Sequence, residues 1–196
     1  MSHDQAADSH ATTTGIPHRK LLMWTFIGSE CMLFGSLIAG YLAYRGRSVV
    51  GPYPEDLLNI PFITVTTFVL LMSSLAMVLA LSAVQRSQRR ATILWLTTTA
   101  VLGVIFLGGQ YYEFSHFVHE GLGLSQNLFS ATFFLLTGTH GAHVTVGVIW
   151  LLSLLGMELK GNLGTEKAEI VEVAGLYWHF VDVIWIVLFT VIYLLV

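Results

Sequence analysis

Seven titratable side chains lie within or beside the long apolar stretches of this chain, at spacings that could support chemistry. They are Glu30, Glu113, His116, His140, His143, His179 and Asp182. Six of them form three pairs separated by three residues, and residues three apart share one face of a helix. Such pairs could ligate a metal, carry protons or substrate, or hydrogen-bond to a neighbouring helix.

A metal site would need these side chains to converge. Glu113 and His116 have the Glu-x-x-His spacing of carboxylate-bridged di-iron bundles, in which the motif occurs twice with further glutamates. Here it occurs once, near the end of an apolar stretch, and the other ligands are missing. The plainer interpretation is a polar zipper that locks helices together, and a proton or substrate pathway is a third. Spacing alone leaves all three open.

Composition shows which elements must position these residues. The chain has 196 residues, of which 55% are hydrophobic and only 11% charged. Soluble domains carry about 25% charged residues, so the composition predicts an integral membrane protein of one domain. A net charge of -3 gives no reason to expect nucleic acid as a partner. Cys31 is the only cysteine, which excludes an internal disulfide.

Five stretches are long enough to cross a hydrocarbon core of about 30 Å. They cover approximately residues 21–44, 61–84, 91–114, 128–157 and 170–196. The connections between them are short and no internal repeat is evident. The sequence therefore predicts an all-α bundle of five transmembrane helices over residues 20–196, preceded by a disordered polar tail over residues 1–19.

Basic residues predict the orientation of the bundle. Seven would lie on one side of the membrane: Arg19, Lys20, Arg86, Arg89, Arg90, Lys160 and Lys167. Only Arg45 and Arg47 would lie on the other. Because basic loops stay in the cytoplasm, we expect a cytoplasmic N-terminus and an external C-terminus.

The rise of about 1.5 Å per residue gives the depth of each polar side chain. Glu30 lies some ten residues, or about 15 Å, into its span, and His143, His179 and Asp182 fall near the same level. These four residues are therefore expected at the middle of the bilayer. Glu113 and His116 are expected at its outer boundary.

Small and aromatic residues predict how the helices pack. Small residues that would let helices approach closely recur in the first and fourth spans. They are Gly28, Gly35, Ser36, Gly40, Gly138, Gly141 and Gly147. Trp24, Trp95 and Trp178 lie near predicted span ends, as interfacial anchors would.

Four motifs carry a resemblance to a known family. They are SECMLF in the first span, YYEFSH at the end of the third, TGTHGAHV in the fourth and YWHFVDVIW in the fifth. Over residues 20–196 the chain resembles subunit III of the haem–copper terminal oxidases, in the short five-helix form found in bacteria. The resemblance implies a multi-pass protein of the bacterial plasma membrane.

The resemblance also implies a function. In this family subunit I holds the redox centres, so haem and copper are expected in partner subunits and none in this chain. Subunit III is expected to pack on subunit I, to bind structural phospholipid in a cleft, and to support proton uptake and turnover stability. Subunit II, a small subunit IV and membrane lipids are further expected partners. Cytochrome c is favoured over quinol as the electron donor, with both left open.

The motifs assign the polar residues by position. Glu30 matches the family's buried glutamate, and His140, His143, His179 and Asp182 match its other intramembrane polar positions. None is expected to be catalytic or to bind metal; His179 and Asp182 are expected in a hydrogen-bond network, with Glu30 and His143 as candidate partners. The alternative is a small proton-coupled transporter that uses Glu30 and the intramembrane histidines as a relay. A metal-dependent membrane enzyme is a further rival.

Overall fold

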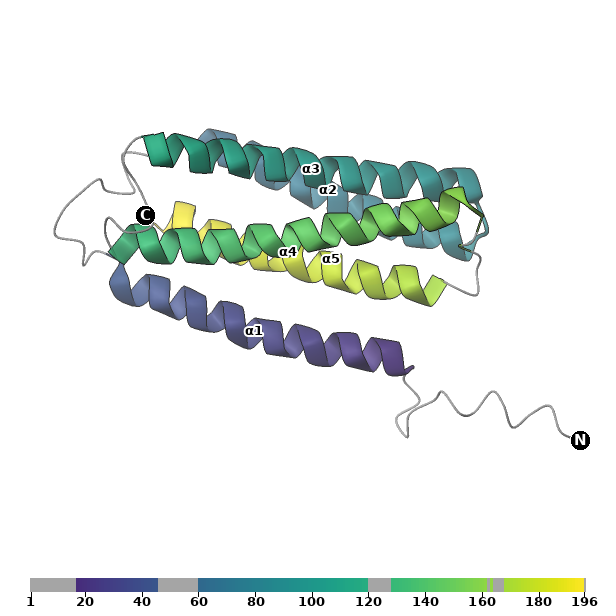
Figure 1. Ribbon diagram of the computed structural model, residues 1–196, viewed down its shortest axis with the longest axis horizontal. Coiled ribbons are helices and arrows are strands. Elements are labelled where there is room, and N and C mark those ends of the chain that lie inside the picture. Colours follow the sequence, from purple (N-terminus) through teal and green to yellow (C-terminus); the bar gives the residue numbers. More distant parts are fainter. Residues whose placement is uncertain (1–16, 46–59, 120–127, 162, 164–167, 196) are drawn as a thin grey trace, which may run out of the picture.

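The computed structural model describes residues 17–45, 60–119, 128–161, 163 and 168–195, and the description below is of these residues (Figure 1). Its elements are helices: α1 His18–Tyr44, α2 Ile60–Gln85, α3 Arg89–His119, α4 Leu128–Leu159, α5 Ala168–Phe189 and a terminal π-helix, η4, Thr190–Leu194. Five of the helical segments are long and apolar enough to cross a membrane. The predicted all-α, five-span architecture is confirmed. Residues 1–16 of the predicted tail lie outside the described residues, and its last two residues, His18 and Arg19, belong to α1.

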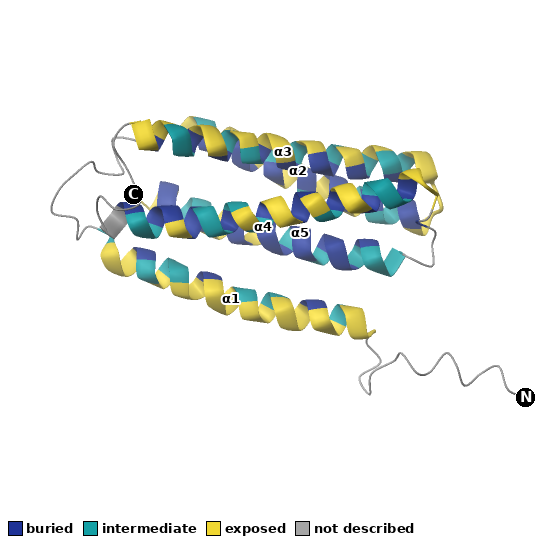
Figure 2. Ribbon diagram, viewed as in Figure 1, coloured by how far each residue is buried: buried dark blue, intermediate teal, exposed yellow. Residues whose placement is uncertain are grey.

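α5 lies at the centre of the bundle and α1 at its edge. α5 contacts α1, α2 and α4, while α2 pairs closely with α3 and α3 with α4. In an apolar stretch of 18 residues from the span that contains α5, 50% of the residues are buried inside the protein. The corresponding share in α1 is 17%. Figure 2 shows the difference, with α1 largely exposed and α5 largely buried. α1 therefore depends on a small number of contacts for its position.

Two tryptophans of α5 attach it to α2 through hydrogen bonds. The indole N–H of Trp178 donates to Ser73 Oγ at 3.0 Å, and that of Trp185 donates to Thr67 Oγ1 at 2.9 Å. A buried indole needs an acceptor for its N–H, and α2 supplies one to each ring. Trp178 is only 1% exposed, so its predicted role as an interfacial anchor is wrong. Trp24, at 57% exposure, does lie on the outer surface.

Glycines admit the Trp178 ring between α3 and α4. A Cβ atom would lie 2.7 Å from the ring at Gly103 and 2.8 Å from it at Gly147. At Gly141 it would lie 2.9 Å from Gln110 Oε1. The close-packing interpretation therefore holds for Gly141 and Gly147.

No described helix of this chain makes such a close approach at four other glycines. A Cβ atom would meet nothing within 4 Å at Gly28, Gly35, Gly40 or Gly138. The three glycines of α1 lie on a helix whose outward faces no other described helix covers, which spacing along the sequence could not reveal.

Polar contacts fix both ends of the bundle. Lys20 Nζ lies 2.7 Å from Glu172 Oε1 and joins α1 to α5. Arg45 donates to the carbonyl oxygen of Leu195, which ties the other end of α1 to the residue after η4. Arg89 Nη2 donates to the Leu159 carbonyl at 2.8 Å and so satisfies the end of α4.

The helices alternate in direction, as Figure 1 shows, so most described basic residues gather at one end of the bundle. They are Arg19, Lys20, Arg86, Arg89, Arg90 and Lys160. Arg45 lies at the other end, and Arg47 and Lys167 lie outside the described residues. This grouping agrees with the predicted sidedness; which end faces the cytoplasm stays a prediction.

Candidate functional site

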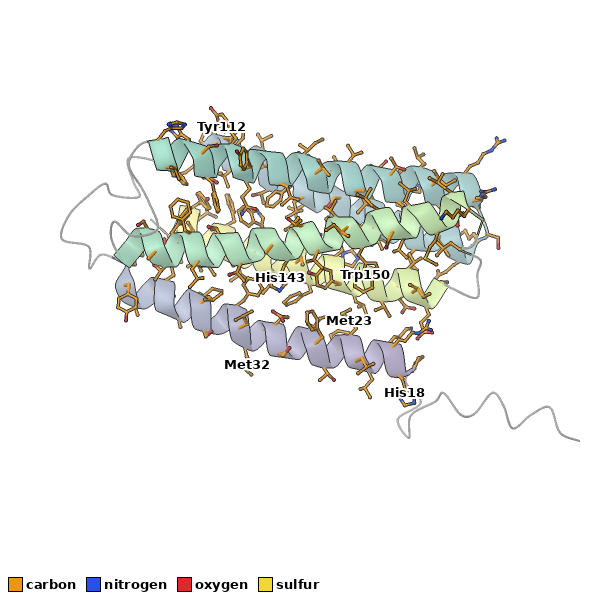
Figure 3. All side chains as sticks on the ribbon, in the orientation of Figure 1. His18, Met23, Met32, Tyr112, His143 and Trp150 are labelled. Carbon is orange, nitrogen blue, oxygen red and sulfur yellow. The ribbon has the colours of Figure 1, made fainter. Side chains whose placement is uncertain are left out.

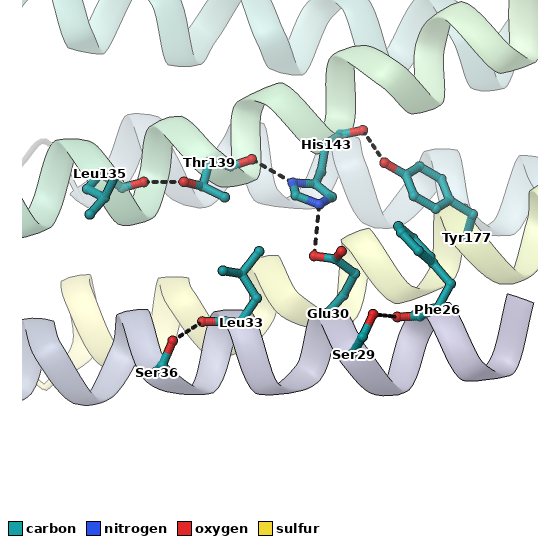
Figure 4. Close-up of polar contacts among 9 residues, drawn as sticks. All are labelled: Phe26, Ser29, Glu30, Leu33, Ser36, Leu135, Thr139, His143 and Tyr177. Atoms are coloured by element: carbon teal, nitrogen blue, oxygen red, sulfur yellow. Dashed lines mark hydrogen bonds and ion pairs between the residues drawn. The ribbon is translucent and has the colours of Figure 1, made fainter.

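Glu30 and His143 form a polar contact between α1 and α4 near the middle of the spans (Figure 4). His143 Nε2 lies 3.1 Å from Glu30 Oε2, and His143 Nδ1 lies 2.8 Å from the Thr139 carbonyl oxygen. A carbonyl oxygen only accepts, so Nδ1 carries a hydrogen and donates it. The contact with Glu30 then needs one more proton, carried either by Nε2 or by the carboxyl group. Tyr177 of α5 donates its hydroxyl to the His143 carbonyl at 2.9 Å.

This contact lines an apolar groove between α1 and the α4–α5 pair. A pocket of about 480 Å³ is bounded by Met23, Phe26, Glu30, Ala142, His143, Val146, Trp150 and Tyr177. A second pocket, of about 420 Å³, shares Met23, Phe26 and Trp150 with the first and continues to Arg19, Leu22, Ile170 and Val173. We call the two together the α1 groove. Figure 3 shows Met23, His143 and Trp150 in the region between α1 and α4, whereas Met32 points away.

His179 and Asp182 turn toward α2 instead. His179 Nδ1 lies 2.6 Å from Ser74 Oγ. The Asp182 carboxylate is only 3% exposed and lies near the Ser74 hydroxyl, yet outside hydrogen-bonding geometry. These residue types match a nucleophilic triad, but the arrangement does not. In a triad the aspartate bonds to the imidazole, whereas here it approaches the serine.

His140 is an aromatic core residue. It is 0% exposed, its ring stacks on Trp185 with centroids 4.9 Å apart, and Phe106 meets it edge-on at 6.0 Å. Neither ring nitrogen has a hydrogen-bond partner among the described residues. His140 thus points into the bundle, while His143, one turn later, points to α1.

Glu113 and His116 separate at the far end of α3. Glu113 is 5% exposed, and both of its carboxylate oxygens accept from the Tyr193 hydroxyl, at 3.0 and 3.1 Å. His116 is exposed on the outside of the bundle. The Glu-x-x-His spacing therefore does not bring these two side chains to one centre.

The seven predicted residues thus occupy several separate places. No group of three or more His, Cys, Asp or Glu side chains that could hold a metal is found in the described part of the chain. Glu30 and His143 bond to each other and not to His179 or Asp182, contrary to the partnership expected from their equal depth. Depth fixes the height of a residue in the bundle, and its direction around the helix decides its partner.

Several partners in these contacts were not predicted. Ser74, Thr139 and Tyr193 are the residues that bond to His179, His143 and Glu113, respectively. Serine and threonine are frequent in membrane helices, where they bond to their own backbone, so they carry no distinguishing signal. A tyrosine within an apolar span is a better signal, because its buried hydroxyl needs a partner.

Known proteins with similar sequences identify the family. A family model described as cytochrome c oxidase subunit III matches residues 4–196. Cytochrome c oxidase subunit 3 of Bacillus sp. (strain PS3) is 40% identical over 190 residues, which cover 97% of this chain and 91% of that protein. The probable quinol oxidase subunit 3 of Staphylococcus saprophyticus is 36% identical over 196 residues, covering 100% and 97%. Quinol oxidase subunit 3 of Bacillus subtilis (strain 168) is 37% identical over 172 residues, covering 88% and 84%.

With five apolar helices and a match over nearly its whole length, the chain belongs to the subunit III family of the haem–copper terminal oxidases, as a multi-pass protein of the bacterial plasma membrane.

Proposed function

We propose that the chain is a non-catalytic subunit III that packs on the redox subunit of a proton-pumping oxidase and holds phospholipid in the α1 groove. In this role it supports proton uptake and prolongs turnover, while haem and copper reside in subunits I and II. A small subunit IV is a further partner. The α1 groove is the observation that carries the proposal.

The groove has the two features that a phospholipid needs. Its walls are mostly apolar and lead from the start of α1 to Glu30 and His143, so an acyl chain can lie along them. Arg19 lines the end of the groove and forms no ion pair with a described residue, whereas the adjacent Lys20 is bound to Glu172. A guanidinium can donate two parallel hydrogen bonds to a phosphate group. We therefore assign the headgroup phosphate to Arg19.

The same geometry connects lipid to turnover stability. α1 is the least buried span; the Glu30–His143 contact joins it to α4, and the Lys20–Glu172 ion pair joins it to α5. A chain in the groove would add dispersion contacts along both walls. Loss of the lipid would loosen α1 against α4 and α5 and so weaken the subunit during turnover.

In this proposal the electron donor binds to the partner subunits and not to this chain. Relatives named cytochrome c oxidase and quinol oxidase subunit 3 have similar identities to this chain, 40% and 36–37%. Cytochrome c stays the favoured donor. The test is whether the purified complex oxidises reduced cytochrome c faster than quinol.

The transporter alternative requires a relay that passes from Glu30 through the histidines. Among the described residues, Glu30 and His143 bond to each other, His140 bonds to neither, and His179 bonds to Ser74. This separation favours the oxidase role. A purified chain that carried protons across liposomes without the other subunits would support the transporter instead.

Lipid retention in the intact oxidase tests the proposal. The complex is purified through a tag on its haem-bearing subunit, and phospholipid is quantified by mass spectrometry in wild type, Arg19→Ala and Arg86→Ala. Arg86 is a matched control, because it is an exposed arginine at the same end of the bundle, outside the groove. We expect Arg19→Ala to lose about one phospholipid per complex and to inactivate at least about twofold faster during turnover.

Two results would contradict the proposal at different points. Absence of this chain from the wild-type complex would refute its role as an oxidase subunit. Equal lipid content and equal inactivation rates in Arg19→Ala and Arg86→Ala would refute the groove as the lipid site, while leaving the subunit role intact.

A further inference from the structure

One face of α5 is partly exposed along its length and is most exposed in its second half, at Val183 and Ile186. The residues on this face are spaced three or four apart. They are Glu172, Leu176, His179, Val183 and Ile186 of α5, followed by Thr190, the first residue of η4; we call them the α5 strip. Val183 is 57% exposed and Ile186 41%, although α5 is the most central helix of the bundle. The first and last strip residues have polar contacts, Glu172 with Lys20 and Thr190 with the Ile186 carbonyl.

The α5 strip runs between α1 and α2. On one side of it, Phe180 packs against Phe34 of α1. On the other, Trp185 donates to Thr67 of α2. The residues of α5 that line the α1 groove, among them Val173 and Tyr177, lie away from the strip. A helix on the strip and a lipid in the groove would therefore occupy opposite sides of α1.

His179 makes the strip unsuited to lipid. Its Nδ1 atom is satisfied by Ser74, but no described residue bonds to Nε2, and the side chain is partly exposed. His179 lies eleven residues into a span of 27, which is about 17 Å and close to its middle. Hydrocarbon offers no hydrogen-bond partner, so an imidazole nitrogen turned toward lipid at this depth is costly.

The outer faces of α1 and α4 differ in this respect. Exposed serine and threonine hydroxyl groups there donate to carbonyl oxygens of their own helices, as Thr25, Ser29 and Ser36 do on α1 and Thr145 and Ser153 on α4. Side chains satisfied in this way are compatible with surrounding lipid. No backbone group of the described residues bonds to Nε2 of His179 in this way.

We propose that the α5 strip is the docking surface for a transmembrane helix of the larger, redox-carrying subunit, whose hydroxyl, amide or carboxyl group hydrogen-bonds to His179 Nε2. Val183 and Ile186 supply the apolar contacts on either side of that bond. The proposal rests on the proposed function for the existence of this partner and adds the face that it covers. One polar contact in an otherwise apolar strip would fix the register of the two helices.

Photo-cross-linking in native membranes tests the docking face. A benzophenone amino acid replaces Val183 on the strip, or Val104 on the outer face of α3 as a control of similar exposure, 57% against 53%. After irradiation the oxidase is purified through its haem-bearing subunit, and the adducts are identified by mass spectrometry. We expect the Val183 position to give an adduct with the redox subunit, and the Val104 position to give lipid adducts.

The other outcomes overturn the proposal. Adducts of the Val183 position with lipid only, or with a second copy of this chain, would show that no partner helix covers the strip. An adduct with the redox subunit from Val104 alone would move the interface to α3. The presence of the chain in the purified wild-type complex is checked before any cross-link is interpreted. Its absence would contradict the proposed function itself and not only the docking face.

A set of substitutions tests the His179 contact separately. His179→Leu removes both bonds of the ring, His179→Gln keeps an amide able to form them, and Ser74→Ala removes only the internal one. Hydrogen bonds between membrane helices average about 0.6 kcal/mol, which corresponds to about a threefold change in an equilibrium. We expect retention of the subunit after detergent washing to fall about threefold in His179→Leu only. An equal loss in Ser74→Ala would assign His179 to internal packing and overturn the contact with the partner.

Discussion

The Glu30 carboxyl group and the His143 imidazole lie 3.1 Å apart, across the groove that separates α1 from α4, and their contact requires a shared proton. The requirement follows from the other side of the ring, where Nδ1 donates to the Thr139 carbonyl. The side chains are 15% and 18% exposed, so the contact lies in the groove wall and not in the sealed core. Among the described residues, it joins the first half of α1 to the bundle together with the Lys20–Glu172 ion pair.

Replacing Glu30 should weaken the attachment of α1 without stopping oxygen reduction. Glu30→Ala leaves His143 Nε2 without its partner, whereas Glu30→Gln keeps an amide that can donate to this nitrogen. We expect Glu30→Ala to lower retention of the subunit or to shorten the active lifetime of the oxidase, and Glu30→Gln to do so less. Initial turnover should stay within about threefold of wild type, because the substitution removes a structural contact and not an acid–base group, whose loss would lower the rate far more.

Initial rate, its decay and subunit content are measured on one preparation of each variant. A fully assembled Glu30→Ala complex with an initial rate lowered about a hundredfold would place Glu30 on an obligatory proton path. The structural role proposed for the Glu30–His143 contact would then be wrong.

The sequence predicts the helices of this protein better than it predicts the contacts between them. Span length and apolarity are properties of one segment, and the five spans follow from them directly. Depth is likewise a one-dimensional quantity, which is why Glu30 and His143 could be proposed at one level. Depth does not give the direction in which a side chain points around the helix axis, so the contact of His179 with Ser74 of α2 could not be derived.

Trp178 shows a second limit of the same kind. A tryptophan near the end of an apolar stretch predicts an interfacial anchor, because its N–H prefers water. In the folded protein Ser73 of α2 accepts that hydrogen, and Gly103 and Gly147 leave room for the ring. Burial of Trp178 thus depends on three residues from three other helices.

Tyr193 should stabilise the end of the bundle through Glu113. Its hydroxyl donates to both carboxylate oxygens of Glu113, and both residues are at least 95% buried. Tyr193→Phe leaves that carboxylate without this donor, at a cost of about 1–3 kcal/mol in the free energy of unfolding. Unfolding of the purified subunit in mixed micelles measures it. Tyr111→Phe, at a 77% exposed tyrosine, removes the same group as a control and should change little; equal effects would contradict the role of the Tyr193–Glu113 contact.

The separated subunit should bind less than about one equivalent of iron or copper, because in the part of the chain that the structure describes the histidines inside the spans, His140, His143 and His179, hydrogen-bond or pack and do not converge on one point. Elemental analysis of the chain after removal from the complex measures this. His140 stacks on Trp185, while His143 faces Glu30, so these two rings have different surroundings. One retained equivalent of metal that disappears in the double variant His140→Ala with His143→Ala would restore the metal hypothesis.

The two ends of the bundle should lie on opposite sides of the membrane, with α1 beginning in the cytoplasm. Six described basic residues gather at that end and Arg45 lies at the other. Alkaline phosphatase, which folds only outside the cytoplasm, should be active when fused after Val196. A fusion after Arg86, between the second and third spans, is the control and should be inactive. A stable but inactive fusion after Val196 would contradict the predicted orientation.

Gly147 should be more sensitive to an added methyl group than Gly156 of the same helix. A Cβ atom at Gly147 would lie 2.8 Å from the Trp178 ring, whereas at Gly156 it would meet nothing within 4 Å. The ring cannot move away easily, because Ser73 holds its N–H and Gly103 contacts its other edge. Overpacking of this kind costs about 1–3 kcal/mol. Alanine at an open helical position instead gains up to about 1 kcal/mol in helix propensity.

We therefore expect Gly147→Ala to lower the free energy of unfolding and Gly156→Ala to leave it unchanged or raise it, in the same mixed-micelle assay. Trp178→Phe replaces the indole that Gly147 faces with a smaller ring and leaves Tyr177 Cε1, 3.2 Å from the added Cβ, in place, so Gly147→Ala should cost less in that background. If Gly147→Ala lowered the free energy of unfolding equally in wild type and in Trp178→Phe, the alanine would act through a contact other than the one with Trp178. No cost in either would mean that α4 shifts to accept the methyl group, and that this close approach to Trp178 does not position α5.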